Sequence, residues 1–335
     1  MPGSECILKT ESLTKRYGTL TAVDTLNLEI NRGEVFGLLG PNGAGKTTTT
    51  LMLLGLTEPT AGSAHILGRD CTKNPIAVKR VVGYLPDNMG FYAHMTGREN
   101  LRFTGRVNGL GEKEIEERIE SLTERVGLTE SIDRRAGSYS KGMKQRLGIA
   151  DILMKDPEIL IMDEPTTGLD PEGTRALMDL VRRLSVEEHK TILISSHQLY
   201  QVQQVCDRVG IFVKGKLVAS GPIGELGRQL EQSGSYAIEV MASPAGELLE
   251  ELIRGVEGVE EIEREHDMFL VRSSVDIRQP LMKALVEKGF SPEHLRQRGS
   301  DLDEIYRRYF DKGGDSHGSD SERTGARRFG RKARA

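Results

Sequence analysis

A chain of 335 residues has room for one large domain and a smaller one, and its 37% hydrophobic and 29% charged residues are typical of a globular protein. The formal net charge of −4 provides no strong positive field, so nucleic acid is not expected as a partner. There is no run of about 18 apolar residues and no basic start followed by an apolar stretch, so the sequence predicts neither a membrane span nor a signal peptide. The cysteines, Cys6, Cys71 and Cys206, are too few and too far apart for a disulfide framework or a zinc site.

The first 220 residues alternate short apolar runs with helical patterns. Residues 7–13 and 26–30 alternate apolar and polar side chains, which predicts half-buried antiparallel strands. Residues 35–39, 159–162 and 191–194 are continuously apolar, which is typical of buried strands in a parallel sheet. The fold class expected is therefore α/β, with helices on both faces of the sheet.

A glycine-rich segment follows the predicted strand 35–39 and precedes a predicted helix over residues 48–55. It has the pattern G-x-x-x-x-G-K-[ST] and consists of Gly40, Pro41, Asn42, Gly43, Ala44, Gly45, Lys46 and Thr47. Glycines let the backbone N–H groups turn inward around phosphate oxygens, and the start of a helix attracts anions. Lys46 would reach the β- and γ-phosphates and Thr47 would ligate Mg²⁺, whereas a bare pattern match would be a turn with no ligand.

Acidic side chains stand at the end of the predicted strand 159–162. Because ligands bind at the carboxyl ends of parallel strands, Asp163 is expected beside the phosphate loop, holding Mg²⁺ through water, and Glu164 near the γ-phosphate, orienting the attacking water. Two acids that only cap the following turn are the alternative. His197 follows strand 191–194 at the same edge, where it would donate to the γ-phosphate rather than serve the structure alone.

A helical pattern is predicted from Glu99 to about Arg125, and residues 112–125 carry a one-sided apolar stripe. Farther on, Ser140 is a good N-cap for a helix. Residues 140–147 resemble the signature motif of the ABC ATPase family, more usually Leu-Ser-Gly-Gly-Gln. Ser140 and Gly142, which would touch phosphate, match the family, whereas Lys141 replaces its first glycine and Met143-Lys144 its glutamine.

The order of the motifs also resembles this family, over residues 5 to about 225. The resemblance implies that Tyr17 stacks on adenine, that Thr48 belongs to the nucleotide-binding segment and that Asp170 lies in a loop at a dimer interface. Asp87 stands where the family usually has a glutamine near Mg²⁺, so a carboxylate would approach the metal there. The cofactors implied are ATP and Mg²⁺.

The family resemblance further implies a head-to-tail pair of ATPases, in which each ATP lies between Lys46 of one chain and Ser140 of the other. This pair would be a homodimer or two different ATPase subunits, bound to membrane permease subunits at the cytoplasmic face of the membrane. The closing motion would pass to the permease through residues 87–96. The alternatives are an ATPase of this type that acts on DNA or ribosomes, and a regulator that binds ATP without hydrolysis. A long coiled coil, a second cassette or the absence of Lys46 or Glu164 would favour them, and the sequence has none of these.

A second domain is predicted after residue 225, with strand, helix, two strands, helix and strand between residues 236 and 294 and a final helix over residues 301–310. This ferredoxin-like βαββαβ order is expected for a small α+β domain. Residues 301–306 resemble the end of an accessory domain on ATPases of ABC-2-type exporters, which favours export through an ABC-2-type permease.

The expected organisation is therefore a P-loop NTPase core over residues 5–224, with an antiparallel β subdomain and a helical subdomain at about 88–150. The accessory domain is expected at 225–312 and a disordered basic tail at 313–335, rich in Gly, Ser and, after Glu322, Arg and Lys. The tail would be a solubilising segment or would touch anionic lipid.

Overall fold

The computed structural model describes residues 5–223, 225–226 and 236–298. The expected helix at 301–310, the basic tail and the two ends of the expected accessory domain lie outside the described residues. No helix within the described ranges is long and apolar enough to cross a membrane.

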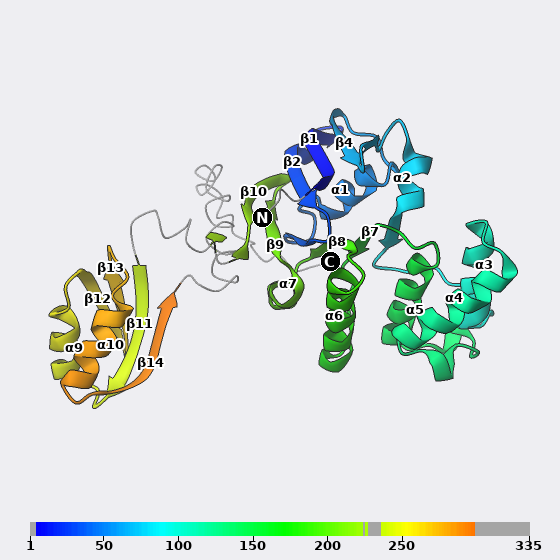
Figure 1. Cartoon of the computed structure of the whole chain (residues 1–335). Coiled ribbons are helices and arrows are strands. Elements are labelled where there is room, and N and C mark those ends of the chain that lie inside the picture. The colour runs from blue at the N-terminus through cyan, green and yellow to red at the C-terminus, as the bar shows by residue number, and fades with distance from the viewer. Residues whose placement is uncertain (1–4, 224, 227–235, 299–335) are drawn as a thin grey trace, which may run out of the picture.

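A six-stranded sheet with the order β10-β9-β3-β8-β7-β6 forms the centre of the N-terminal region (Figure 1). Strands β6 to β9 and β3 pair in parallel, and β10 joins the edge in antiparallel orientation. This confirms the parallel sheet predicted from the apolar runs. The strands are β3 (Val35–Leu39), β6 (Val82–Leu85), β7 (Ile159–Asp163), β8 (Thr191–Ser196), β9 (Arg208–Val213) and β10 (Lys216–Gly221).

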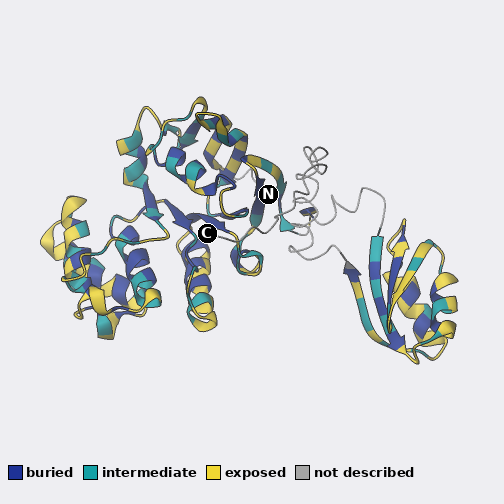
Figure 2. Cartoon of the chain, turned by 180° about the vertical axis from the view of Figure 1, so that it is seen from behind, coloured by how far each residue is buried: buried dark blue, intermediate teal, exposed yellow. Residues whose placement is uncertain are grey.

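Alternate side chains of the central strands enter two different hydrophobic cores. On β7, Ile159 and Ile161 belong to one hydrophobic core, whereas Leu160 and Met162 belong to the core on the other face of the sheet. Because both faces are covered, the strand must be apolar throughout, which is why its sequence does not alternate. Figure 2 shows these strands buried and the outer faces of the helices exposed.

One face is covered by a second sheet, with the order β2-β1-β4-β5, and by two helices. The antiparallel pairing of β1 with β2 confirms the prediction from the alternating N-terminal pattern, and β4 and β5 extend it. The elements of this layer are β1 (Cys6–Tyr17), β2 (Leu20–Asn31), β4 (Ala61–Ile66), β5 (Arg69–Asp70), α1 (Lys46–Leu53) and α2 (Pro75–Val81).

Helices cover the other face, and three of them, α3, α4 and α5, gather at one side of the sheet (Figure 1). The single helical stretch predicted from Glu99 to Arg125 is wrong in one respect, since residues 108–111 are not helical and divide it into two helices. Gly109, with a φ of 79°, turns the chain there, and few other residues adopt that angle. The elements are α3 (Gly97–Val107), α4 (Glu112–Arg125), η1 (Thr129–Ser131), η2 (Ala136–Ser138), α5 (Lys141–Leu153), α6 (Pro171–Val186) and α7 (Leu199–Val205).

Residues 236–298 form an antiparallel sheet with the order β12-β13-β11-β14 and two helices. The element order and the strand order are those of a ferredoxin-like βαββαβ unit, as the sequence predicts. Its hydrophobic core contains residues of this segment alone among those described. The elements are β11 (Tyr236–Ser243), α9 (Glu247–Arg254), β12 (Val259–Glu265), β13 (Met268–Ser273), α10 (Arg278–Glu287) and β14 (Ser291–Arg298).

Candidate nucleotide site

The glycine-rich loop connects the carboxyl end of β3 to the start of α1. Gly45, with a φ of 109°, precedes Lys46, and a Cβ at Gly45 would lie 2.3 Å from the carbonyl oxygen of Ala22 and 2.8 Å from the ring of Phe212. A Cβ at Gly40 would lie 2.4 Å from the carbonyl oxygen of Phe212. The loop therefore lies too close to β2 and β9 for any side chain at these two positions, and at Gly45 the backbone angle also favours glycine.

Lys46 is 5% exposed, and its ammonium group folds back over the loop. Nζ donates to the carbonyl oxygens of Gly40 at 2.7 Å and Pro41 at 3.3 Å, and lies 3.3 Å from Oε1 of Glu164. A buried cation held by carbonyl oxygens and one carboxylate is matched to an anionic group that enters the loop. Phosphate oxygens can therefore replace the internal partners of the Lys46 ammonium group.

Asp163 lies directly beside the loop. Its Oδ2 accepts a hydrogen bond of 3.0 Å from the hydroxyl of Thr47, and Oδ1 accepts one from the hydroxyl of Ser195 on β8. Hydroxyl and carboxylate oxygens are the ligands that Mg²⁺ prefers, so Thr47 and Asp163 fit this metal. Among the described residues no group of three or more His, Cys, Asp or Glu side chains forms a metal site. A metal here would therefore take its other ligands from phosphate and water, as Mg²⁺ commonly does.

Glu164 and His197 meet at the ends of β7 and β8. Nδ1 of His197 lies 2.8 Å from Oε2 of Glu164, while the other carboxylate oxygen faces Lys46. Glu164 adopts a φ of 48°, which is uncommon for a residue with a side chain. The carboxylate is thus held between a buried lysine and a histidine, in a position to orient a water molecule against a phosphate on the loop.

A cavity of about 730 Å³ opens over the loop. Tyr17 is 48% exposed at one side of it, with Nζ of Lys15 5.0 Å from the ring centroid. An exposed aromatic ring beside a phosphate loop can stack on a base. The lining residues are Tyr17, Leu20, Thr21, Ala22, Pro41, Asn42, Gly43, Gly45, Lys46, Thr47, Thr48, Asp87, Asp163, Glu164, Lys214 and Gly215.

Sequence reasoning missed part of this cavity. Thr21 and Ala22 come from β2, and Lys214 comes from the turn after β9, where no motif marks them. Gly40 and Ala44, which were expected to bind nucleotide, are buried residues of the loop that do not line the cavity. Their contribution is to the shape of the loop, since Gly40 supplies the carbonyl group that holds Lys46.

Asp87 is an exposed lining residue at the end of β6, on the same cavity as Asp163. Burial, followed by the charges of Asp163 and Asp87, raises the pKa of the nearby Tyr84 to about 12. Tyr84 therefore keeps its proton at neutral pH and presents a neutral hydroxyl to two carboxylates. A second carboxylate at this position brings negative charge close to the place where Mg²⁺ fits.

Three more residues expected to take part in nucleotide binding, Ser140, Gly142 and Asp170, do not line this cavity, and neither does His197. Ser140 caps α5, where its hydroxyl accepts from the N–H of Met143 at 3.2 Å, and Gly142 lies in the first turn. Asp170 caps α6 in the same way, accepting from the N–H of Gly173 at 2.8 Å. None of the described residues that line the cavity comes from either helix start. One copy of the chain therefore provides the phosphate loop and the signature helix at separate places.

Comparison with known proteins agrees with this fold and site. Residues 23–167 match the family described as ABC transporter. The chain is 45% identical over 220 residues to the bacitracin transport ATP-binding protein BcrA of Bacillus licheniformis, covering 66% of this chain and 71% of BcrA. It is 35% identical over 305 residues to the daunorubicin/doxorubicin resistance ATP-binding protein DrrA of Streptomyces peucetius, covering 89% of this chain and 91% of DrrA.

A solved structure supports the same assignment. The structure of cbiO1 from Clostridium perfringens, part of an ABC transporter complex, has a TM-score of 0.62 and 30% identity, covering 68% of this chain and 94% of that one. A phosphate loop with a buried lysine, acids at the end of β7 and a serine-capped helix define an ATP-binding cassette. The chain belongs to the ABC transporter ATP-binding family. It is an ATPase subunit, and subunits of this family dimerise and work with transmembrane partners.

Proposed function

We propose that this chain drives export by hydrolysing ATP between two cassettes bound head to tail. The phosphate loop of one copy and the serine-capped helix α5 of the other would grip the same γ-phosphate. Loss of that phosphate on hydrolysis would remove the shared ligand and weaken the closed pair.

The observation that carries this proposal is the incomplete site of a single chain. Lys46 and Glu164 line one cavity, with His197 bonded to Glu164, whereas Ser140 and Gly142 occupy a helix start outside it. A helix N-terminus is an anion site, and an exposed one with a capping hydroxyl is suited to a phosphate brought by another copy. Asp170, at the start of α6, would lie at the same interface.

In this proposal Glu164 orients the attacking water and His197 contacts the γ-phosphate. The bond between His197 and Glu164 holds the carboxylate in place before nucleotide enters. Mg²⁺ would be held by Thr47 and through water by Asp163, with Asp87 near it, and would neutralise charge on the β- and γ-phosphates. Tyr17 would stack on the adenine, and the loop from Gly40 to Thr47, with Thr48, would hold the phosphates.

The test is Glu164→Gln. This variant retains the shape and the hydrogen-bonding capacity of the side chain but loses the base, so we expect turnover to fall at least about 100-fold, as for loss of a general base. ATP should remain bound and the dimer should accumulate, which size-exclusion chromatography with light scattering would detect. Glu130→Gln, at an exposed site in η1, is the matched control and should retain parent turnover. ATP hydrolysis by Glu164→Gln at near the parent rate would exclude Glu164 as the base.

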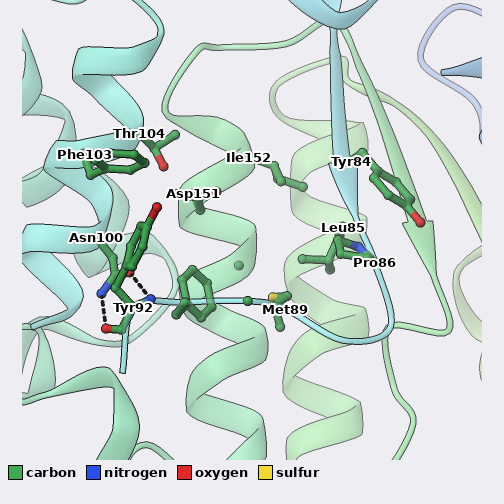
Figure 3. A pocket seen from close by; sticks show the side chains of 13 residues that line it. Tyr84, Leu85, Pro86, Met89, Tyr92, Asn100, Phe103, Thr104, Asp151 and Ile152 are labelled. Atoms are coloured by element: carbon green, nitrogen blue, oxygen red, sulfur yellow. Dashed lines mark hydrogen bonds between the residues drawn. The ribbon is translucent and has the colours of Figure 1, made fainter. Parts of the chain in front are cut away.

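We further propose that a groove beside β6 receives a helix of the membrane partner. A cavity of about 270 Å³ lies between the segment after β6 and helices α3 and α5 (Figure 3). Tyr92 and Phe103 on its rim are 46% and 43% exposed and lie edge to face with centroids 5.2 Å apart. Asn100 holds the rim by accepting from the N–H of Tyr92 at 2.9 Å and donating to its carbonyl at 3.2 Å.

The groove is also lined by one carboxyl group. Asp151 lines it from α5, and burial raises the pKa of its carboxyl group against opposing effects from Thr104 and Lys155. An aromatic rim around a carboxyl group is complementary to an apolar helix that carries one basic or hydroxyl side chain. The segment from Asp87 to Thr96 joins this groove to the nucleotide cavity, so a closing motion at the nucleotide cavity would also move the groove.

Tyr92→Ala with Phe103→Ala should weaken binding to the membrane subunits while leaving the ATPase activity of the isolated chain intact. Val107→Ala, on α3 and 70% exposed, is the matched control because Val107 does not line the groove. Co-purification with membranes that contain the permease measures the effect. Normal recovery of the double variant in the membrane fraction would argue against this docking site.

The names of two relatives support our proposal for the class of permease and the direction of transport. BcrA is named for bacitracin transport and DrrA for resistance to daunorubicin and doxorubicin, and the likeness to DrrA extends over most of this chain. These names support export, an ABC-2-type permease and a location at the cytoplasmic face of the membrane. They also disfavour an ATPase that acts on DNA or ribosomes. We propose domain limits at 5–224 and 225–312, with the helical subdomain at about 88–150.

A further inference from the structure

The sheet of residues 236–298 has one face covered by its own helices. Ile238 and Val240 of β11 and Phe269 and Val271 of β13 are buried against α9 and α10. Because side chains alternate along a strand, the intervening residues belong to the opposite face. No described element of this segment packs on that second face.

The second face carries glutamates on one edge strand and a histidine and an arginine on the other. Glu261, Glu263 and Glu265 occupy alternate positions of edge strand β12, and His294 and Arg296 occupy alternate positions of edge strand β14. The two middle strands contribute a mostly apolar centre with a few charges. The residues of this open face on the middle strands are Met268, Leu270 and Arg272 of β13 and Ala237, Glu239 and Met241 of β11.

The register places these charges in rows across the sheet. One row runs from Glu263 through Leu270 and Glu239 to Arg296. The next runs from Glu265 to His294, through Met268 and Met241. Within the sheet, Arg272 lies 3.4 Å from Glu261 and 3.3 Å from Glu263, and His294 lies 3.4 Å from Glu239. One arginine cannot neutralise three glutamates, so the β12 edge keeps a net negative charge.

We propose that the open face binds the same face of a second copy of this chain. Rotation about a two-fold axis parallel to the strands lays β12 of one copy over β14 of the other and β13 over β11. Every row then meets its own reversed image, with Glu263 opposite Arg296 and Glu265 opposite His294 of the second copy, and each pair occurs twice. A two-fold axis perpendicular to the strands would instead set glutamate over glutamate.

The area of the face limits the strength of such a contact. Four strands about 4.8 Å apart and about six residues long present roughly 400 Å² per copy. The total of about 800 Å² is below the 1,200–2,000 Å² typical of stable interfaces, so the contact is weak on its own. Between copies already joined through their cassettes, tethering raises the effective concentration to the millimolar range. The contact would therefore hold the two subunits together when the cassettes separate after hydrolysis.

Charge reversal on full-length chains without nucleotide tests this pairing. We expect Glu263→Lys with Glu265→Lys, and separately His294→Glu with Arg296→Glu, each to raise the Kd of self-association about tenfold or more, since the Glu263–Arg296 pair is lost and like charges then face each other on both sides of the axis. Mixing the two variants should restore association, because the new lysines on β12 of one variant then face the new glutamates on β14 of the other. Glu247→Lys with Glu251→Lys, on the exposed surface of α9, is the matched control and should behave as the parent. Sedimentation velocity at low salt provides the Kd values.

Cross-linking locates the contact independently of variant stability. In a chain with Cys6→Ser, copies carrying Met268→Cys are mixed with copies carrying Met241→Cys, and a bismaleimide of about 10 Å bridges the expected gap between packed sheets. A cross-linked mixed dimer is expected, and Met282→Cys on α10 should give none. The proposal is overturned if mixing fails to restore association, if the parent shows no association at any concentration, or if Met268→Cys cross-links within its own chain.

Discussion

Replacing Lys46 by alanine should weaken ATP binding by a factor that the contacts of its ammonium group define. The group donates to the carbonyl oxygens of Gly40 at 2.7 Å and Pro41 at 3.3 Å, and it lies 3.3 Å from Oε1 of Glu164 as an ion pair. The shortest bond holds the loop, so the two longer contacts are those that phosphate oxygens would replace. Hydrogen bonds to charged groups contribute about 1.5–3 kcal/mol each, so losing two costs about 3–6 kcal/mol, or a Kd about 10²–10⁴ times higher.

The alanine variant also leaves the carbonyl group of Gly40 without its donor. This costs about 1–3 kcal/mol of stability, so thermal unfolding must be measured beside binding. Isothermal titration calorimetry with ATP gives the Kd values of the folded variant. Lys73→Ala is the matched control, since Lys73 is exposed and pairs with Asp70 outside the cavity. A Kd for Lys46→Ala within threefold of the parent value would refute the assignment of the ammonium group to phosphate.

Two further predictions follow from packing and burial. Gly45→Ala should lower the unfolding free energy by at least about 1–3 kcal/mol, because its Cβ would lie 2.3 Å from a carbonyl oxygen in a strained backbone, whereas Gly68→Ala, also at positive φ but with no atom within 4 Å, should cost less. Thermal unfolding compares the two, and equal losses would exclude the contact as the cause. Burial raises the pKa of Cys71 to about 12 and that of Cys206 even further, so at pH 8 a thiol reagent should modify exposed Cys6 first. Mass spectrometry of the labelled native chain checks this, and early labelling of Cys71 would contradict its burial.

The sequence by itself determined the features that depend on neighbouring residues. The phosphate loop from Gly40 to Thr47 is readable because eight consecutive residues build it, with the strand before and the helix after supplying the context. Ser140 is readable as a helix cap because a capping side chain bonds to a backbone N–H three residues on. The alternation of residues 26–30 likewise reports a strand with one buried face.

Local breaks in a pattern were harder to read. The helical period of α3 and α4 continues across residues 108–111, and the sequence prediction followed the period rather than Gly109, whose positive φ ends the first helix. A glycine within a helical pattern is tolerated often enough that it does not by itself mark an end.

Only the tertiary structure decided which distant residues meet. Thr47 and Asp163 are 116 residues apart, and they touch because the parallel strands β3, β8 and β7 end at the same edge of the sheet. The pairing of His197 with Glu164, the hydroxyl of Ser195 on Asp163 and the walls of the cavity at Thr21 and Lys214 depend on the same strand order. Local propensity encodes where strands begin and end, whereas burial of both faces of the sheet selects the order in which they pair. The rows of charge on the open face of residues 236–298 arise in the same way, because the register between strands sets which edge charges share a row.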